Sequence, residues 1–291
     1  MIRATHLSKH YGATLALDRL DLNVPPGAVF GLLGPNGSGK TTFIKLLLGL
    51  VFPDTGSVES DAVAAHRIGY LPERITLPTR SRIDEYLRLC AYLDGLRGAA
   101  LASAVDTRLR QVGLDQVARN RIGSCSKGML QRLGLAAALI ADPPLLVLDE
   151  PMEGLDPAWQ KSVRELIMQL RRDGRTVLLS THRLRDVAEV CGHVAILAGG
   201  RLKRAGALVD VLPLRERVVI DVDQMPEALA ASMAVLGPGI TVQGGHVLLE
   251  GQAVARKHDV LRKMLDAGVD VRGLAQQRLT LEEIYLEAMR P

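Results

Sequence analysis

A glycine-rich segment that ends in lysine and threonine is the first stretch of this chain with the residue types and spacing for chemistry. It begins at Gly34 and fits the pattern Gly-x-x-x-x-Gly-Lys-[Ser/Thr], with Gly39, Lys40 and Thr41 at the fixed positions. The glycines let successive main-chain N–H groups surround a polyphosphate. The lysine reaches the β and γ phosphates, and the threonine hydroxyl binds Mg²⁺. The segment therefore predicts a site for a magnesium-bound polyphosphate.

The residues on either side of this segment favour the same site. An apolar run at residues 28–33 precedes it and predicts a buried strand, and apolar residues at helical spacing follow it from Thr42 to Leu50. This order places the loop at a helix N-terminus, which carries the equivalent of roughly half a positive charge. The alternative is a chance glycine-rich turn, which has no need of a flanking strand and helix.

Two acidic residues, Asp149 and Glu150, stand at the end of a second predicted buried strand that begins at Leu145. In a doubly wound sheet, ligands bind at the carboxyl edge of the strands. We expect Asp149 to hold Mg²⁺, directly or through water, and Glu150 to take a proton from an attacking water. The alternative role for this pair is helix capping, which does not require the glycine loop.

A third predicted buried strand, residues 176–181, ends in His182. A lone histidine is more often structural than catalytic, but this one lies on the edge that carries both acids. We therefore expect a polar contact from His182 to the terminal phosphate. The remaining histidines have no such placement, and we predict structural or surface roles for them.

Two further positions have weaker signals. Ser126 stands at the expected N-cap of a helix of small and apolar residues, where a second anion could bind or where the serine could simply cap the helix. Tyr11 precedes a glycine on an early loop. It could stack on an adenine ring or be an ordinary turn tyrosine, and composition alone does not choose.

The composition indicates a soluble protein, which we expect in the cytoplasm. The 291 residues allow one large domain or two smaller ones, and aliphatic residues must build the core because only 3% are aromatic. No signal-peptide core and no apolar run of the ~20 residues needed for a membrane helix is present. The three cysteines are isolated, which argues against disulfides and zinc, and the net charge of +4 is scattered, which favours a solvated surface over nucleic-acid or lipid binding.

The pattern of elements changes near Pro213. Before it we predict early strands within residues 2–24, a strand at 67–73, and two helices between 82 and 112 separated by glycines. After it we predict a strand at 217–222, a helix at 227–236, a hairpin at 240–250 on Gly244-Gly245, a helix at 253–267, a strand at 269–274 and a last helix capped by Thr280 and Glu283. The order βαββαβ is typical of a small ferredoxin-like domain.

Taken together, the motifs resemble the ATPase subunit of an exporter-type ATP-binding cassette (ABC) transporter. The similarity covers about residues 1–212, and the motifs follow the family's order. They are the phosphate loop at 34–42, the signature segment at 125–129, the magnesium and base strand at 145–150, the D-loop at 154–157 and the switch histidine His182. The resemblance implies an α/β fold, the P-loop NTPase ABC ATPase domain, with a RecA-like core sheet, an antiparallel β subdomain and a helical subdomain. The appendage at 213–291 would be the small α+β ferredoxin-like domain.

The resemblance also implies roles for individual residues. The ATP contacts would be Tyr11, Asn36, Gly37, Ser38, Gly39, Lys40, Thr41, Thr42, Ser126 and Gly128. The Mg²⁺ ligands would be Thr41, Glu73 and Asp149, and the catalytic residues would be Glu150 and His182. Tyr11 would stack on adenine. Ser126 and Gly128 would contact the γ-phosphate of ATP bound to a second copy of the chain in a head-to-tail dimer.

A separate membrane protein is the other partner that the resemblance implies. Residues 73–79 and the two helices after them would dock a polytopic permease subunit, which would hold the chain on the cytoplasmic face of the membrane. Closure of the dimer on ATP and its opening after hydrolysis would then drive transport. The transported substrate is chosen by the permease, which is a different chain.

This sequence departs from the family pattern at three places. Of the usual Leu-Ser-Gly-Gly-Gln signature only Ser126 and Gly128 match, Glu73 stands where the family has glutamine, and Met152 and Glu153 replace small hydroxylated residues before the D-loop. These changes motivate one alternative, a nucleotide-binding regulatory subunit with little hydrolysis. A second alternative is a soluble cassette ATPase that acts on nucleic acid or ribosomes. The single cassette without long basic arms counts against it, so we expect no nucleic-acid partner.

Overall fold

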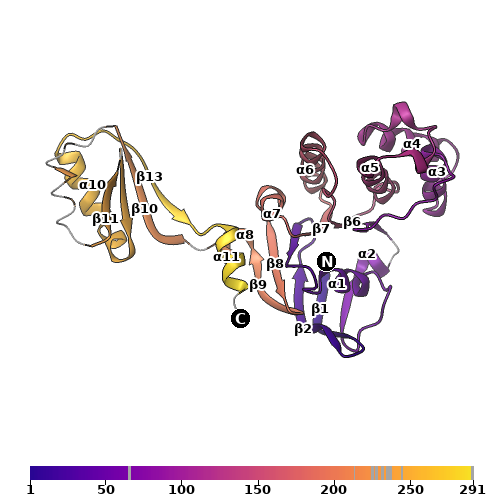
Figure 1. The fold of residues 1–291 in the computed structure, drawn as a ribbon, viewed down its shortest axis with the longest axis horizontal. Helices are drawn as coiled ribbons and strands as arrows, with labels where there is room; N and C mark the ends of the chain where they lie inside the picture. The colour runs from indigo at the N-terminus through magenta and orange to yellow at the C-terminus, as the bar shows by residue number, and fades with distance from the viewer. Residues whose placement is uncertain are drawn as a thin grey trace. The chain divides into compact units, whose positions relative to one another are not determined.

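The computed structural model describes residues 1–291 except 65–66, 213, 224–225, 227–228, 231–232, 234–237, 244 and 290–291. The described backbone divides into two compact units, one consisting mainly of Met1–Val211 and the other of Leu212–Glu287 (Figure 1). Each unit has its own sheets and its own buried core, so each is described separately.

A six-stranded sheet forms the centre of the first unit. Its order is β5-β6-β7-β3-β8-β9, and every neighbouring pair is parallel except β8 and β9. The bounds are β3 (Val29–Leu33), β5 (Ile68–Leu71), β6 (Leu145–Asp149), β7 (Thr176–Thr181), β8 (His193–Ala198) and β9 (Arg201–Ala207). All residues of β3, β6 and β7 are buried, as expected for aliphatic runs that are covered on both faces.

Layers cover both faces of this sheet. Helices α6 (Pro157–Arg172) and α7 (Leu184–Val190) lie on one side, and α1 (Lys40–Leu47) lies on the other (Figure 1). Beyond α1 is an antiparallel sheet of order β2-β1-β4, made of β1 (Ile2–Tyr11), β2 (Thr14–Val24) and β4 (Thr55–Ser60). One apolar cluster joins these layers and includes Leu20 of β2, Phe30 of β3 and Phe43 of α1.

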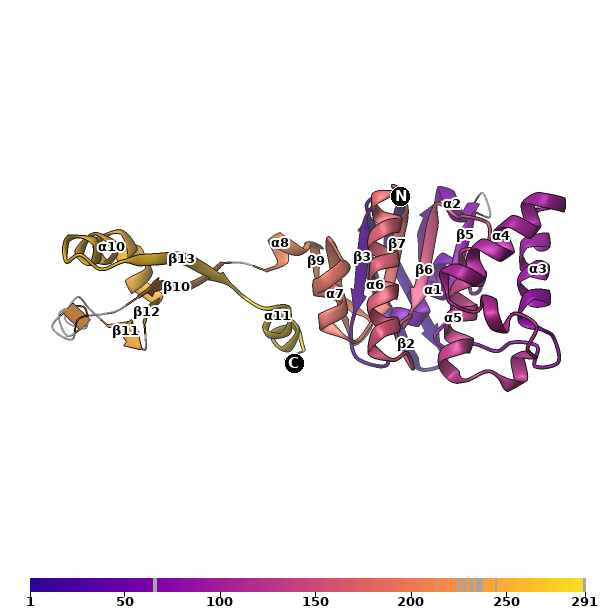
Figure 2. The same cartoon turned by 90° about the horizontal axis from the view of Figure 1, so that it is seen from above.

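A helical group packs around a second apolar cluster. It contains α3 (Ile83–Leu93), α4 (Gly98–Gln111) and α5 (Lys127–Ala138), which lie together at one end of the first unit (Figure 2). Leu87, Leu109 and Leu133 are buried at their contact. The predicted N-cap is confirmed, because Ser126 Oγ accepts a hydrogen bond from Met129 N at 3.2 Å. Short helices complete the unit: α2 (Asp61–Ala64), α8 (Leu208–Val211) and single turns at Asp115–Val117 and Ile122–Ser124.

The second unit contains an antiparallel sheet of order β11-β12-β10-β13. The bounds are β10 (Leu214–Val222), β11 (Ile240–Gln243), β12 (His246–Glu250), β13 (Val271–Arg278), a turn Gly251–Arg256, α10 (Lys257–Asp266) and α11 (Leu281–Ala288). This is the strand order of a ferredoxin-like fold. Most of the helix predicted at 227–236, and Gly244 of the predicted turn, lie outside the described residues.

The structure confirms some of the predicted elements and adds others. The last helix begins with the predicted capping box, in which Thr280 N donates to Glu283 Oε2 at 2.8 Å and Glu283 N donates to Thr280 Oγ1 at 3.3 Å. Strands β8 and β9 and helix α7 were not predicted. Among the helices that the structure describes, none combines the length and the apolar character needed to cross a bilayer.

Candidate active site

The glycine-rich loop connects β3 to α1, and its glycines are required by close backbone contacts. Gly39 stands at the N-cap of α1 with a φ of 106° and offers the helix no side-chain cap. A Cβ there would lie 2.7 Å from the carbonyl oxygen of Ala16, and a Cβ at Gly34 would lie 2.4 Å from that of Leu197. Because no side chain caps the helix, its first amides are available to an anion.

A cavity of about 680 Å³ opens over this loop. Its lining includes the predicted residues Asn36, Gly37, Ser38, Gly39, Lys40, Thr41, Thr42, Glu73, Asp149, Glu150 and His182. They meet because β3 pairs in parallel with β7, and β7 with β6, so the carboxyl ends of the three strands share one edge. The cavity therefore combines amides, one lysine and several carboxylates in one space.

Lys40 folds back over the loop. Its Nζ donates to the carbonyl oxygens of Gly34 at 2.7 Å and Pro35 at 3.2 Å. Burial lowers the pKa of the ammonium group, and the charges of Glu150 and Asp149 oppose that shift. A buried cation at a loop of open amides is suited to an oxyanion with several negative charges.

Two hydroxyl groups of the loop have different surroundings. That of Ser38 is buried, and that of Thr41 faces Asp149. Ser38 Oγ is buried and has no hydrogen-bond partner among the residues described, although a buried hydroxyl normally has one. Thr41 Oγ1 lies 3.5 Å from Asp149 Oδ2. Both residues line the cavity, and the Thr41 hydroxyl faces the Asp149 carboxylate there.

The pair Thr41 and Asp149 fits a magnesium ion. Both supply hard oxygen atoms, and their separation of 3.5 Å can be bridged by an ion that binds each oxygen at about 2.1 Å. No cluster of three or more His, Cys, Asp or Glu side chains suited to a metal occurs in the described part of the chain. Mg²⁺ usually takes one or two carboxylates and fills its shell with water and phosphate oxygens, so one carboxylate and one hydroxyl supply enough protein ligands for it.

Asp149 is a buried carboxylate with other carboxylates nearby. Its burial raises its pKa, and the charges of Glu73 and Glu150 raise it further, whereas Lys40 opposes them. A divalent cation beside Asp149 would stabilise the ionised carboxylate that this environment disfavours. The electrostatics of the acids therefore favour a cation at this position.

Glu150 is held in one orientation by the strand next to it. Its Oε1 accepts from the His182 main-chain N at 2.9 Å and lies 2.7 Å from His182 Nδ1, while its Oε2 accepts from Thr181 Oγ1 at 3.0 Å. The backbone of Glu150 has a φ of 50°, a left-handed conformation that costs a non-glycine residue on the order of 1–3 kcal/mol. Gln131 Nε2 donates to the Glu150 carbonyl at 3.1 Å and helps to hold it.

Three of the predicted site residues lie outside the cavity lining. Tyr11 is 46% exposed, with Lys9 Nζ 5.8 Å from the centre of its ring. Ser126 caps α5, and a Cβ on Gly128 would lie 3.3 Å from the carbonyl oxygen of Gly154. Within one copy of the chain, the structure does not bring these residues to the phosphate loop.

The cavity also contains residues that the sequence did not point to. Thr14, Leu15 and Ala16 from β2 line it, as do Arg74 and Glu153. Lys127, the residue after Ser126, forms an ion pair with Glu153 at 2.6 Å. The sequence signals for these contacts are weak, because each depends on how distant segments pack.

Comparison with known proteins identifies the family. A model of the ABC transporter family matches residues 17–153. An ABC transporter ATP-binding protein of Synechocystis is 36% identical, over 94% of this chain and 78% of that protein. A daunorubicin resistance ATP-binding protein of Streptomyces coeruleorubidus is 34% identical over 96% and 92%, and a Nod factor export ATP-binding protein of Cupriavidus metallidurans is 36% identical over 69% of each chain.

Solved structures agree with this assignment. The ATP-binding subunit of an ABC transporter has a TM-score of 0.68 and 31% identity, covering 72% of this chain and 91% of its own. A dimeric ATP-binding cassette bound to ADP and phosphate has a TM-score of 0.66 over 72% and 99%, and at 23% identity it shows the fold alone. The chain therefore belongs to the family of ABC transporter ATP-binding proteins, and its first unit has the fold of that family's ATPase cassette.

Proposed function

We propose that this chain hydrolyses ATP as one half of a dimeric motor and powers export through a separate membrane permease. The observation that carries the proposal is the cavity that joins the phosphate loop to Asp149, Glu150 and His182. The names of two relatives, which refer to Nod factor export and to daunorubicin resistance, support export as the direction of transport.

Each cavity residue has a distinct task in this proposal. The amides of residues 36–42 and the Lys40 ammonium bind the phosphates, while Thr41 and Asp149 hold Mg²⁺, with Glu73 near the same ion. When bound, Mg²⁺ neutralises phosphate charge and so favours attack by water. Glu150 accepts the proton of that water, and His182 orients the Glu150 carboxylate through the contact between Nδ1 and Oε1.

The three predicted residues outside the cavity have two roles in this proposal. Ser126 and Gly128 contact the nucleotide of a second copy, and Tyr11 contacts the adenine. Ser126 and Gly128 lie at the start of α5, where a second copy could place its own nucleotide against the helix N-terminus that Ser126 caps. Tyr11 offers a half-exposed ring for the adenine. Residues 212–287 then form an appendage that takes no part in the phosphate chemistry.

The permease needs an apolar surface on the cassette, and α3 provides one. Leu89, Tyr92 and Leu93 are 52%, 53% and 74% exposed. A second cavity of about 680 Å³ lies beside them, lined by residues of β5, α3 and α5. Exposed apolar side chains beside a cavity are typical of a protein–protein contact. Docking there would hold the chain at the cytoplasmic face of the membrane.

The decisive test separates nucleotide binding from turnover. Glu150→Gln should reduce turnover by a factor of about 10² to 10⁴, because it removes the proton acceptor, and it should leave ATP affinity unchanged. Lys40→Ala should weaken ATP binding itself, because the phosphates lose their buried cation. Unchanged hydrolysis by Glu150→Gln would remove Glu150 from the role of base, and no affinity for magnesium-ATP in the unmodified protein would overturn the proposal as a whole.

A further inference from the structure

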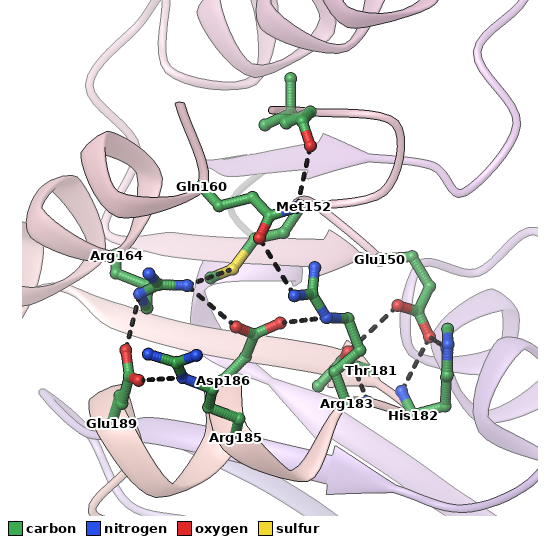
Figure 3. A network of polar contacts seen from close by, with 11 residues as sticks. Glu150, Met152, Gln160, Arg164, Thr181, His182, Arg183, Arg185, Asp186 and Glu189 are labelled. Atoms are coloured by element: carbon green, nitrogen blue, oxygen red, sulfur yellow. Dashed lines mark hydrogen bonds and ion pairs between the residues drawn. The ribbon is translucent and has the colours of Figure 1, made fainter. Parts of the chain in front are cut away.

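A group of charged and polar side chains lies beside the turn that holds Glu150, and the mechanism above does not use it. It consists of Gln160, Arg164, Arg183, Asp186 and Glu189, which we call the arginine network (Figure 3). Its members come from α6, from the turn after β7 and from α7. Two parts of the chain that are separate in sequence, α6 and the stretch from the turn after β7 into α7, are therefore joined at one point beside the active site.

The centre of the network is a buried carboxylate between two arginines. Only 1% of the Asp186 side chain is exposed. Its Oδ1 lies 3.2 Å from Arg164 Nη1, and its Oδ2 lies 3.3 Å from Arg183 Nε. Arg164 Nε in turn contacts Glu189 Oε2 at 2.7 Å. A buried charge is costly unless it is paired, so Asp186 keeps the Arg183 side chain in place.

Arg183 has a second partner, and this partner leads to the D-loop. Arg183 Nη2 donates to Gln160 Oε1 at 3.0 Å, and Gln160 Nε2 donates to the carbonyl oxygen of Leu155 at 2.8 Å. Leu155 lies in the D-loop, residues 154–157. A continuous chain of contacts therefore runs from Asp186 to the D-loop main chain: an ion pair joins Asp186 to Arg183, and two hydrogen bonds of Gln160 complete it.

The main chain of the same arginine belongs to the turn that holds the proposed base. Arg183 N donates to Thr181 Oγ1 at 3.1 Å, and that hydroxyl donates to Glu150 Oε2 at 3.0 Å. The preceding residue, His182, holds Glu150 Oε1 through its main-chain N at 2.9 Å and through Nδ1 at 2.7 Å. The position of this turn therefore sets the direction of the Glu150 carboxylate (Figure 3).

We propose that Arg183 and Gln160 are positioning residues for ATP hydrolysis. They lock the turn at residues 181–183 to the D-loop, so that the grip of Thr181 and His182 on Glu150 depends on where the D-loop lies. Neither side chain lines the nucleotide cavity. The inference rests on the proposed role of Glu150 and deepens it, because it names the residues that fix the orientation of that base.

The first experiment compares two arginines of the same charge that are two positions apart in the sequence, one at the N-cap of α7 and one in its first turn. Arg183→Met should lower kcat about tenfold or more and leave the KM for ATP within about twofold, because a misplaced base slows the chemical step without touching the binding residues. Arg185 is the control: its side chain is 78% exposed and contacts Glu189 at 2.7 Å. Arg185→Met should leave both constants unchanged.

The outcomes distinguish positioning from simple support of the fold. A lower melting temperature with an unchanged kcat per folded molecule, or equal effects of Arg183→Met and Arg185→Met, would overturn the inference. Should Arg183→Met fail to fold, Gln160→Leu decides, because it leaves Asp186 paired with both arginines. Gln160→Leu should also lower kcat with KM unchanged, and an unchanged kcat would overturn the inference.

Two double variants test the link directly. Arg183→Met combined with Gln160→Leu should be no slower than the slower single variant, since both break one chain of contacts, whereas multiplied losses would show independent effects and contradict the link. Arg183→Met in a Glu150→Gln background should cause no further loss. If Glu150→Gln alone retains full turnover, the proposed function fails first. If Glu150→Gln is inactive and Arg183→Met is normal, only the positioning role fails.

Discussion

Single residues at the active site differ in how firmly they are fixed before any ligand binds. Glu150 has both carboxylate oxygens engaged and a main chain in a left-handed conformation, whereas the Lys40 ammonium rests on two loop carbonyls. Lysine can leave such carbonyls for a phosphate at little cost, because it exchanges one set of acceptors for another. The Glu150 carboxylate has no such freedom, so its orientation depends on Thr181 and His182, which hold it.

The pKa of Tyr70 in β5 responds to two carboxylates, Asp149 and Glu73, that would hold Mg²⁺ in the proposed function. Burial, together with the charges of Asp149 and Glu73, raises the pKa of Tyr70 to about 12. Tyr70 therefore contributes stability that is complete below about pH 10 and is lost as pH rises toward 12, since the folded state keeps a proton that the unfolded chain releases. Glu73→Gln should lower this pKa, because it removes one of the two charges.

The measurement is the difference in phenolate absorbance between the protein and its Tyr70→Phe variant during an alkaline titration. The difference cancels the other tyrosines, including Tyr86, whose pKa burial also raises. Glu59→Gln, at an exposed position of β4, is the matched control and should leave the midpoint in place. A midpoint near pH 10 in the unmodified protein would contradict the assigned environment of Tyr70.

At the level of helices and strands, local sequence predicted those elements whose pattern is self-contained. The buried runs of β3, β6 and β7 and the caps of α5 and α11 were predicted because hydrophobic continuity and capping chemistry are local. Strands β8 and β9 were missed, and β9 has little burial to mark it. The carboxyl edge gathered Asp149, Glu150 and His182 as expected, because parallel pairing places strand ends together.

Contacts that depend on tertiary packing could not be predicted. Arg183 contacts Gln160 because α6 lies beside the turn after β7. The sequence around an arginine does not indicate which distant residue it contacts. The same holds for Ala16 of β2, whose carbonyl oxygen approaches Gly39 at the start of α1. The glycine pattern predicted the phosphate loop, but nothing in the sequence identified β2 as the segment that packs against it.

The turn before β4 is tied to β1 by one carboxylate. Asp54 accepts from Lys9 Nζ at 2.9 Å and from the His10 main chain, and these hydrogen bonds, with that of Lys9 the largest, lower the pKa of Asp54 to about 2. Its contribution to stability is therefore present above about pH 4 and is lost as pH falls toward 2. Lys9→Met should raise the pKa of Asp54 toward its ordinary value.

Carboxyl chemical shifts followed by NMR from neutral to acid pH would measure this change. Lys45→Met offers a control, because Lys45 is an exposed residue of α1. It should leave the Asp54 midpoint where it is. An Asp54 midpoint near 4 in the unmodified protein would show that the turn is not held in this way.

At the level of the whole molecule, the proposed head-to-tail dimer makes each site depend on two chains. Lys40→Ala removes the phosphate cation, and Ser126→Glu places a carboxylate where the partner's γ-phosphate should lie, so each homodimer should be inactive. In an equimolar mixture half of the dimers are mixed, and each mixed dimer keeps one intact site. Turnover should therefore recover to at most about a quarter of normal.

Native mass spectrometry would establish that mixed dimers form in this experiment. Lys40→Ala mixed with a Lys40→Ala/Ser126→Glu double variant is the control, since no combination of those chains has an intact site. Mixed dimers without any gain in turnover would contradict the assignment of Ser126 to the partner's nucleotide.

The proposed permease surface makes a separate prediction. Leu93→Glu places a charge on the most exposed apolar side chain of α3, so it should abolish co-purification with the permease and leave the basal ATPase activity intact. Glu165→Gln, on the exposed face of α6, is the control and should leave both co-purification and basal ATPase activity unchanged. Retained association of Leu93→Glu would place the docking surface elsewhere.

The second unit has a buried core that includes Val218, Ile220, Val247 and Met264, and among the described residues this cluster has no member in common with the two clusters of the cassette. Substitutions within it can therefore accumulate without altering the geometry of hydrolysis. Natural or designed chains could therefore combine the same ATPase cassette with a different C-terminal domain, and so with a different mode of regulation.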